Sequence, residues 1–257
     1  MTKGFSFASV ILSYFLIGGG MFTGTLLTSY LHVDSEYVAY GLLALGALVG
    51  GFIAARASRG STVAEPALGA VLVVGSIVGL GALTPYGQLL WGSAHDQTLK
   101  FVASVGVAGV VGALVGASLS EKLFGESTTS SVPWLLYTAL TTFGSSVLVV
   151  LLSSLVFMSE RGSSLNMVSV ILIGMAVGCL LGGIAVGASA RTRPLFAAFL
   201  GGGIGIAGLF TLIARAQSQP MEKDATIGFI VLAVGGSIVT LIGTAIGWAA
   251  IGRRQAG

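Results

Sequence analysis

Hydroxyl side chains are the main polar groups inside the apolar parts of this sequence, and they recur at helical spacing. The two sets are Ser237, Thr240 and Thr244, and Thr138, Thr142 and Ser145. Residues at such spacings share one face of a helix. A stripe of hydroxyls could line a path for a small neutral or weakly polar solute. The alternative is that each hydroxyl bonds to a backbone carbonyl of its own helix or of a neighbouring helix.

Covalent and acid–base chemistry have little support in these apolar segments. No Asp, Glu, Lys, Arg or His lies near the middle of any of them, and no HExxH, P-loop or serine with an adjacent His or Lys occurs. The lack of such charges also argues against a proton pump and a retinal protein. We therefore predict a protein that is not an enzyme and has no catalytic residue or cofactor. Sodium coupling through hydroxyls and carbonyls alone stays open.

Metal ligands are present but scattered. His32, Asp34 and Glu36 are predicted to share one side of the membrane with His95 and Asp96, without close spacing between the two sets. We interpret them as solvated loop residues and predict no metal site. The one cysteine, Cys179, lies in an apolar segment and is interpreted as a packing residue.

Composition indicates which solvent the chain requires. Of its 257 residues 54% are hydrophobic and 8% are charged, with a mean hydropathy of +0.98, which is too little charge to cover a soluble globule. The net charge of +3 is scattered, so the sequence predicts no nucleic-acid partner. Membrane lipids are the expected partners, with copies of the chain or other membrane subunits as further candidates.

A spanning helix needs about 20 mainly apolar residues. Eight windows satisfy this condition, and they are continuously apolar rather than alternating as in a barrel. The sequence therefore predicts an all-α, polytopic membrane helical bundle of about eight transmembrane helices. The windows are 6–29, 37–57, 64–84, 99–119, 133–157, 167–189, 194–214 and 226–251.

The distribution of basic residues predicts the orientation, because positively charged loops tend to stay cytoplasmic. With the N-terminus inside, eight of the twelve basic residues fall on the inner side, and four, Lys100, Arg161, Arg215 and Lys223, fall on the outer side. We expect an integral protein of a prokaryotic inner membrane with both termini cytoplasmic. Near the inner turn at residues 58–63, Arg56 either pairs with Glu65 or reaches anionic lipid head groups.

The sequence predicts an internal repeat. The glycine and arginine pattern of residues 41–80 returns in residues 174–208, with a drift of a few residues in spacing. We predict two four-helix halves, 1–125 and 126–257, within one integrated membrane domain. Because each half has an even number of spans, the repeat is parallel, with an axis along the membrane normal.

Forty glycines also require an explanation. Many are four residues apart on one helix face, where small residues let two backbones approach closely. One interpretation is that these glycines let the helices of a compact bundle pack closely. The other is that they leave smooth helix surfaces that can slide, or backbone carbonyls that face a pathway. The predicted packing glycines of this zipper pattern are Gly46, Gly50, Gly75, Gly79, Gly112, Gly116, Gly174, Gly178, Gly182, Gly201, Gly205, Gly243 and Gly247.

Two functions follow from these patterns. The first is a transport protein or facilitator for a small uncharged or lipid-like solute, with a pathway between the two repeated halves. The second is a non-catalytic membrane subunit or scaffold of a larger complex that packs through its glycine-rich helix faces. The duplication and the hydroxyl stripes favour transport, and a hydroxyl stripe that faces lipid, or a tightly filled interface, would overturn that preference.

Overall fold

The computed structural model describes residues 5–58, 63–83, 95–124, 134–157, 167–190, 194–216 and 223–251, which form α-helices and no strand. Each predicted window overlaps one described helix, so the all-α bundle is confirmed. Helix α5 is longer than its window because a polar segment extends it past the apolar residues. The helices are α1 (Phe7–Tyr30), α2 (Glu36–Ala57), α3 (Ala64–Leu83), α5 (His95–Phe124), α6 (Trp134–Phe157), α7 (Met167–Ser189), α8 (Leu195–Ala216) and α9 (Lys223–Ala250).

Six of these helices, α1, α2, α5, α6, α7 and α9, are long and apolar enough to cross a membrane. The apolar stretches of α3 and α8 within the described residues are shorter, Ala64–Gly79 and Leu195–Thr211. An apolar helix can cross hydrocarbon because it satisfies its own backbone hydrogen bonds. The chain is therefore a helical membrane bundle, and crossing by α3 and α8 stays a prediction.

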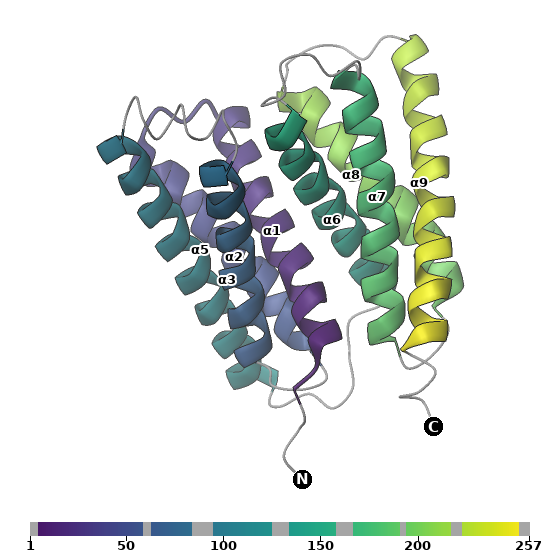
Figure 1. Ribbon diagram of the computed structural model, residues 1–257, viewed down its shortest axis with the longest axis horizontal. Helices are drawn as coiled ribbons and strands as arrows, with labels where there is room; N and C mark the ends of the chain where they lie inside the picture. The colour runs from purple at the N-terminus through teal and green to yellow at the C-terminus, as the bar shows by residue number, and fades with distance from the viewer. Residues whose placement is uncertain are drawn as a thin grey trace.

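The helices form two groups, with α1, α2, α3 and α5 in one and α6 to α9 in the other (Figure 1). In the first group, α2 and α3 each pack against both α1 and α5. In the second group, α7 and α8 each pack against both α6 and α9. The two groups thus share one pattern of neighbours. Helix α1 begins and α9 ends at the same end of the bundle (Figure 1).

Close contacts at glycines also correspond between the groups. In each matched pair the first contact lies in the first group and the second contact lies in the second group. The pairs are Gly69–Ser13 and Gly201–Thr138, Gly51–Ala113 and Gly183–Thr240, and Gly116–Leu48 and Gly243–Leu180. These pairs set a register in which α1, α2, α3 and α5 correspond to α6, α7, α8 and α9. A duplicated four-helix unit would give such contacts, and the duplication itself stays a prediction.

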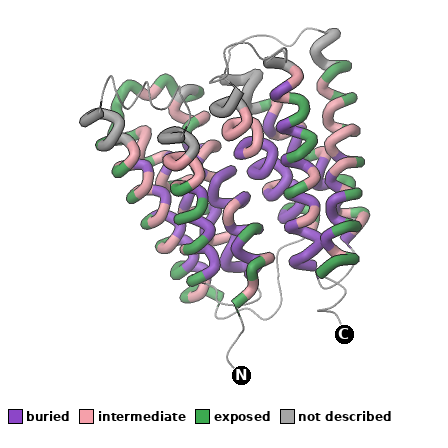
Figure 2. The backbone as a smooth tube through the Cα atoms, viewed as in Figure 1, coloured by how far each residue is buried: buried purple, intermediate pink, exposed green. Residues whose placement is uncertain are grey.

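The most buried helices lie where the two groups meet. In α1, α6 and α7, 56% of the spanning window is buried, whereas α2, α5 and α9 have 28 to 33% buried (Figure 2). The outer helices instead expose ridges of β-branched residues, such as Ile230, Val234 and Ile238 on α9. An outward apolar surface suits a protein whose solvent is lipid.

Candidate functional site

The six hydroxyl residues predicted to line a pathway are all buried, and none is more than 5% exposed. They lie inside the second group of helices. On α6, Thr138 and Thr142 face glycines of α8, and a Cβ built on Gly201 would lie 2.7 Å from the Thr138 Cβ. Ser145 of α6 lies against Gly182 of α7. The α6 stripe therefore occupies closely packed helix contacts within one half.

The stripe on α9 is packed in the same way. A Cβ on Gly203 of α8 would lie 2.6 Å from the Ser237 hydroxyl, and one on Gly202 would lie 2.8 Å from the Thr240 hydroxyl. The Thr244 hydroxyl donates a hydrogen bond of 2.9 Å to the Thr240 carbonyl of its own helix. Here too the hydroxyls fill an interface between helices.

Bonds to the parent helix are common in these stripes. The hydroxyls of Thr138, Ser145 and Ser237 donate to the backbone carbonyls of Trp134, Thr142 and Ala233, at 2.8, 3.2 and 3.0 Å. Such bonds are the packing alternative considered for these residues. The hydroxyls of Thr141 and Thr142 have no hydrogen-bond partner in the part of the chain that is described.

Eleven of the thirteen predicted packing glycines lie where an added Cβ would meet another helix of the chain. Many of these contacts are with backbone atoms; a Cβ on Gly50 would lie 2.7 Å from the Leu16 carbonyl oxygen. The eleven are Gly46, Gly50, Gly112, Gly116, Gly174, Gly178, Gly182, Gly201, Gly205, Gly243 and Gly247. A Cβ on Gly75 or Gly79 would meet no described atom within 4 Å, so these two glycines make no such contact.

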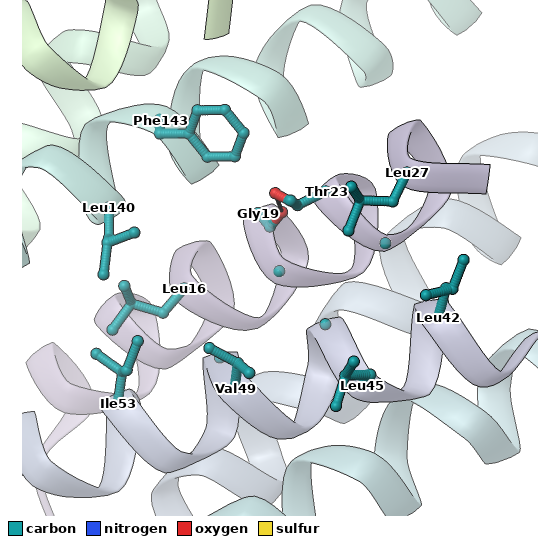
Figure 3. A pocket seen from close by; sticks show the side chains of 14 residues that line it. Leu16, Gly19, Thr23, Leu27, Leu42, Leu45, Val49, Ile53, Leu140 and Phe143 are labelled. Atoms are coloured by element: carbon teal, nitrogen blue, oxygen red, sulfur yellow. Dashed lines mark hydrogen bonds between the residues drawn. The ribbon is translucent and has the colours of Figure 1, made fainter. Parts of the chain in front are cut away.

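An apolar groove lies at the junction of the two groups, between α1, α2 and α6 (Figure 3). Its volume is about 240 Å³. Leu140 and Phe143 of α6 form one wall, and leucine, valine and isoleucine side chains of α1 and α2 form most of the remainder. Among the described lining residues, Thr23 alone has a polar side chain. The groove can hold hydrocarbon but offers almost nothing to a polar solute.

Glycines shape the groove where α1 meets α2. A Cβ on Gly20 or Gly24 would overlap the backbone carbonyls of Gly46 or Leu42, so the two helices touch directly at these positions. The four-residue spacing of Gly20 and Gly24 in the printed sequence is the signal that could have located this contact, and it was not among the predicted glycine pairs. In the register of the two groups, Ser145 and Val149 of α6 stand at the equivalent positions.

A buried carboxylate accepts hydrogen bonds from residues next to the start of α1 and the end of α2. Glu65, in the first turn of α3, is fully buried. The Ser6 backbone N–H donates to its Oε1 at 2.6 Å, and the Ser58 hydroxyl donates to its Oε2. The Ser58 N–H in turn caps α2 by donating to Ala54. Glu65 thus joins the residue before α1 to the turn between α2 and α3.

Arg56 lies in the last turn of α2, in the same region of the chain. Its guanidinium carbon is 4.5 Å from the centre of the Phe124 ring at the end of α5, a cation–π arrangement, and the side chain is buried. This position does not fit an arginine that extends toward lipid head groups. The other alternative, a pairing of Arg56 with Glu65, stays a prediction.

No metal centre is found in the part of the chain that the structure describes, where no three His, Cys, Asp or Glu residues are grouped. The side chains of His95 and Asp96 are outside the described set. Cys179 is buried, and its sulfur lies 3.5 Å from the Ser146 hydroxyl across the α6–α7 contact.

Comparison of the chain with protein-family models, curated proteins and solved structures found no match. The site is therefore interpreted from its own geometry.

Proposed function

We propose that this membrane protein is a facilitator for a lipid-like, uncharged solute, whose hydrocarbon part occupies the groove between α1, α2 and α6. The observation that carries this proposal is the groove's position and lining, since it is apolar and lies where the two groups of helices meet. Its volume is below the range of typical drug-sized pockets, which suits a single hydrocarbon chain.

The matched glycine contacts support two related halves that could move against each other. At the α1–α6 crossing, a Cβ on Gly19 would lie 2.5 Å from the Gly144 Cα, and these two glycines are equivalent in the register of the groups. Contact between equivalent positions is what a two-fold axis through the crossing produces. Transporters built from two repeats work largely by rocking one repeat against the other. The groove then lies beside the pivot.

The hydroxyl stripes lie in tightly filled interfaces, which overturns the preference for transport that was based on these stripes. A polar path along Thr138, Thr142 and Ser145 loses its main support, because these residues fill contacts inside one half. The prediction of transport then rests on the repeat and on the groove, and the groove offers a hydrocarbon surface. A lipid-like solute is therefore favoured over a polar one.

Filling the groove should stop the protein-dependent flux. Val49 lines the groove and is half-exposed, so a Val49→Trp side chain can enter it from the rim without breaking a buried contact. We expect this variant to lower the transbilayer movement of a fluorescent single-chain lipid in proteoliposomes by about tenfold, which corresponds to about 1.4 kcal/mol. The rate is measured against liposomes without protein.

Val71→Trp on α3 is the matched control, because Val71 is similarly exposed and does not line the groove. It should keep the wild-type rate. A wild-type rate equal to that of empty liposomes, or equal losses in both variants, would refute the proposal.

The second candidate, a non-catalytic subunit of a larger complex, has one specific observation in its favour. Gly75 and Gly79 on α3 form a small-residue pair that meets no described atom, and Leu72 beside them is exposed. Such pairs are typical of contacts between transmembrane helices. Native mass spectrometry after gentle extraction separates the candidates, since stoichiometric foreign subunits would favour this second function.

We further propose that the chain is not an enzyme, that membrane lipids are its main partners, and that both termini are cytoplasmic in a prokaryotic inner membrane. The described residues that line the groove include no acid–base group, which supports the first statement. The statement about the termini is supported by the excess of basic residues predicted for the side of the membrane where α1 begins and α9 ends.

A further inference from the structure

Thr23 gives the groove a single point of polar recognition. Its hydroxyl donates a hydrogen bond of 2.8 Å to the Gly19 carbonyl of α1. With its proton used in this way, the oxygen retains acceptor capacity. The other side chains that line the groove, in the part of the chain that the structure describes, are apolar. Among the described side chains, a ligand that fills the groove therefore meets one hydrogen-bond acceptor, the Thr23 hydroxyl.

The position of Thr23 along α1 suits a lipid head group that lies below the membrane surface. Thr23 is seven residues before Tyr30, the last residue of α1, so it lies about 10 Å from that end at 1.5 Å per residue. In the register of the groups its counterpart is Leu148, whose side chain packs against Gly18. The hydroxyl is thus present in the first group of helices and absent at the equivalent position of the second.

We propose that the groove selects single-chain lipids that carry a hydrogen-bond donor, such as a long-chain alcohol, and that Thr23 is the residue that recognises the donor. This inference rests on the proposed function. The lipid O–H donates to Thr23 Oγ1 while the Thr23 O–H continues to donate to the Gly19 carbonyl. An ether or ester, which can only accept, gains no bond unless Thr23 gives up its own. Hence the groove prefers an alcohol to an ether of equal length.

The test compares a long-chain alcohol with the methyl ether of the same chain, each competing with a fluorescent single-chain lipid for the protein in detergent micelles. Wild-type protein should bind the alcohol about 3- to 10-fold more tightly, as one net hydrogen bond provides. Thr23→Val should remove this preference and leave binding of the ether unchanged.

Thr25→Val is the matched control. The Thr25 hydroxyl also donates to a carbonyl of α1, that of Met21 at 3.1 Å, but Thr25 does not line the groove. This variant should keep the preference. If Thr23→Val also keeps the preference for the alcohol, or if the wild-type protein shows no such preference, the inference about Thr23 is wrong, and the proposed function of the groove is unaffected. If Val49→Trp leaves the binding of both probes unchanged, the proposed function and the inference fail together.

Discussion

Gly178→Leu is expected to prevent recovery of a monodisperse protein. A Cβ on Gly178 would already lie 2.5 Å from the Ser146 Cα and 2.8 Å from the Ser145 carbonyl oxygen, both of which belong to the α6 backbone. Backbone atoms cannot rotate away, so α7 must separate from α6 and lose the dispersion contacts that hold them. The cost should reach or exceed about 3 kcal/mol, the upper part of the range for overpacked cores.

Size-exclusion chromatography after detergent extraction, together with thermal unfolding, measures this effect. Gly75→Leu is the control, because a Cβ on Gly75 meets no described atom within 4 Å. It should give wild-type yield and stability. Normal behaviour of Gly178→Leu, or equal damage in both variants, would contradict the packing role assigned to the glycines.

Glu65→Ala is expected to lower the free energy of unfolding by about 3 kcal/mol. The change removes the acceptor for both the Ser6 N–H and the Ser58 hydroxyl in a buried region. The unfolding temperature should fall by about 6 to 12 °C for a chain of this size. Glu65→Gln keeps one carbonyl oxygen as an acceptor and should cost about half as much.

Glu36→Ala is the matched control for this prediction. Glu36 is also a carboxylate in the first turn of a helix, but it is exposed. Its loss should change the unfolding temperature little, since an exposed charge at a helix start contributes only about 0.3 to 1 kcal/mol. Equal shifts of the unfolding temperature for Glu36→Ala and Glu65→Ala would show that the buried hydrogen bonds of Glu65 do not stabilise the protein more than an exposed charge does.

The helices could be predicted from the sequence because hydrocarbon permits few alternatives. An uninterrupted apolar segment of spanning length must form a helix to satisfy its own backbone. The glycine pairs also indicated where helices approach closely, for instance at Gly112 and Gly116, where an added Cβ would meet the Ala44 and Leu48 carbonyls of α2. Spacing alone could not show that Gly75 and Gly79 would differ, because whether a helix face has a neighbour depends on the whole arrangement of helices.

The positions of the hydroxyl stripes and of the groove could not be predicted for a related reason. A stripe such as Thr138 and Thr142 indicates a shared face, but lipid, a pathway and another helix are all compatible with it. The groove depends on where α6 lies relative to α2, which no local pattern encodes. Burial of Glu65 likewise requires the backbone of Ser6, a residue far away in the sequence, to lie beside it.

At three corresponding buried positions the two groups of helices differ in side-chain polarity. In the shared register, Ala47, Ala113 and Ala117 of the first group correspond to Cys179, Thr240 and Thr244 of the second, and all six are buried. One arrangement of helices thus packs around either three alanines or a cysteine and two threonines at these positions. Hydroxyls are therefore not needed to form this arrangement, and in the second group they add bonds to helix carbonyls.

The most direct test of the central claim is to map where a lipid-like solute contacts the protein. A long-chain alcohol with a photoreactive group in its chain is equilibrated with the protein in a bilayer and activated, and mass spectrometry locates the label. We predict labelling of groove residues Leu45 and Val49 well above that of Ile230 and Ile238 on α9, which are similarly exposed to lipid. Equal labelling of both faces would mean that the groove holds only the surrounding lipid, and would contradict the proposed function.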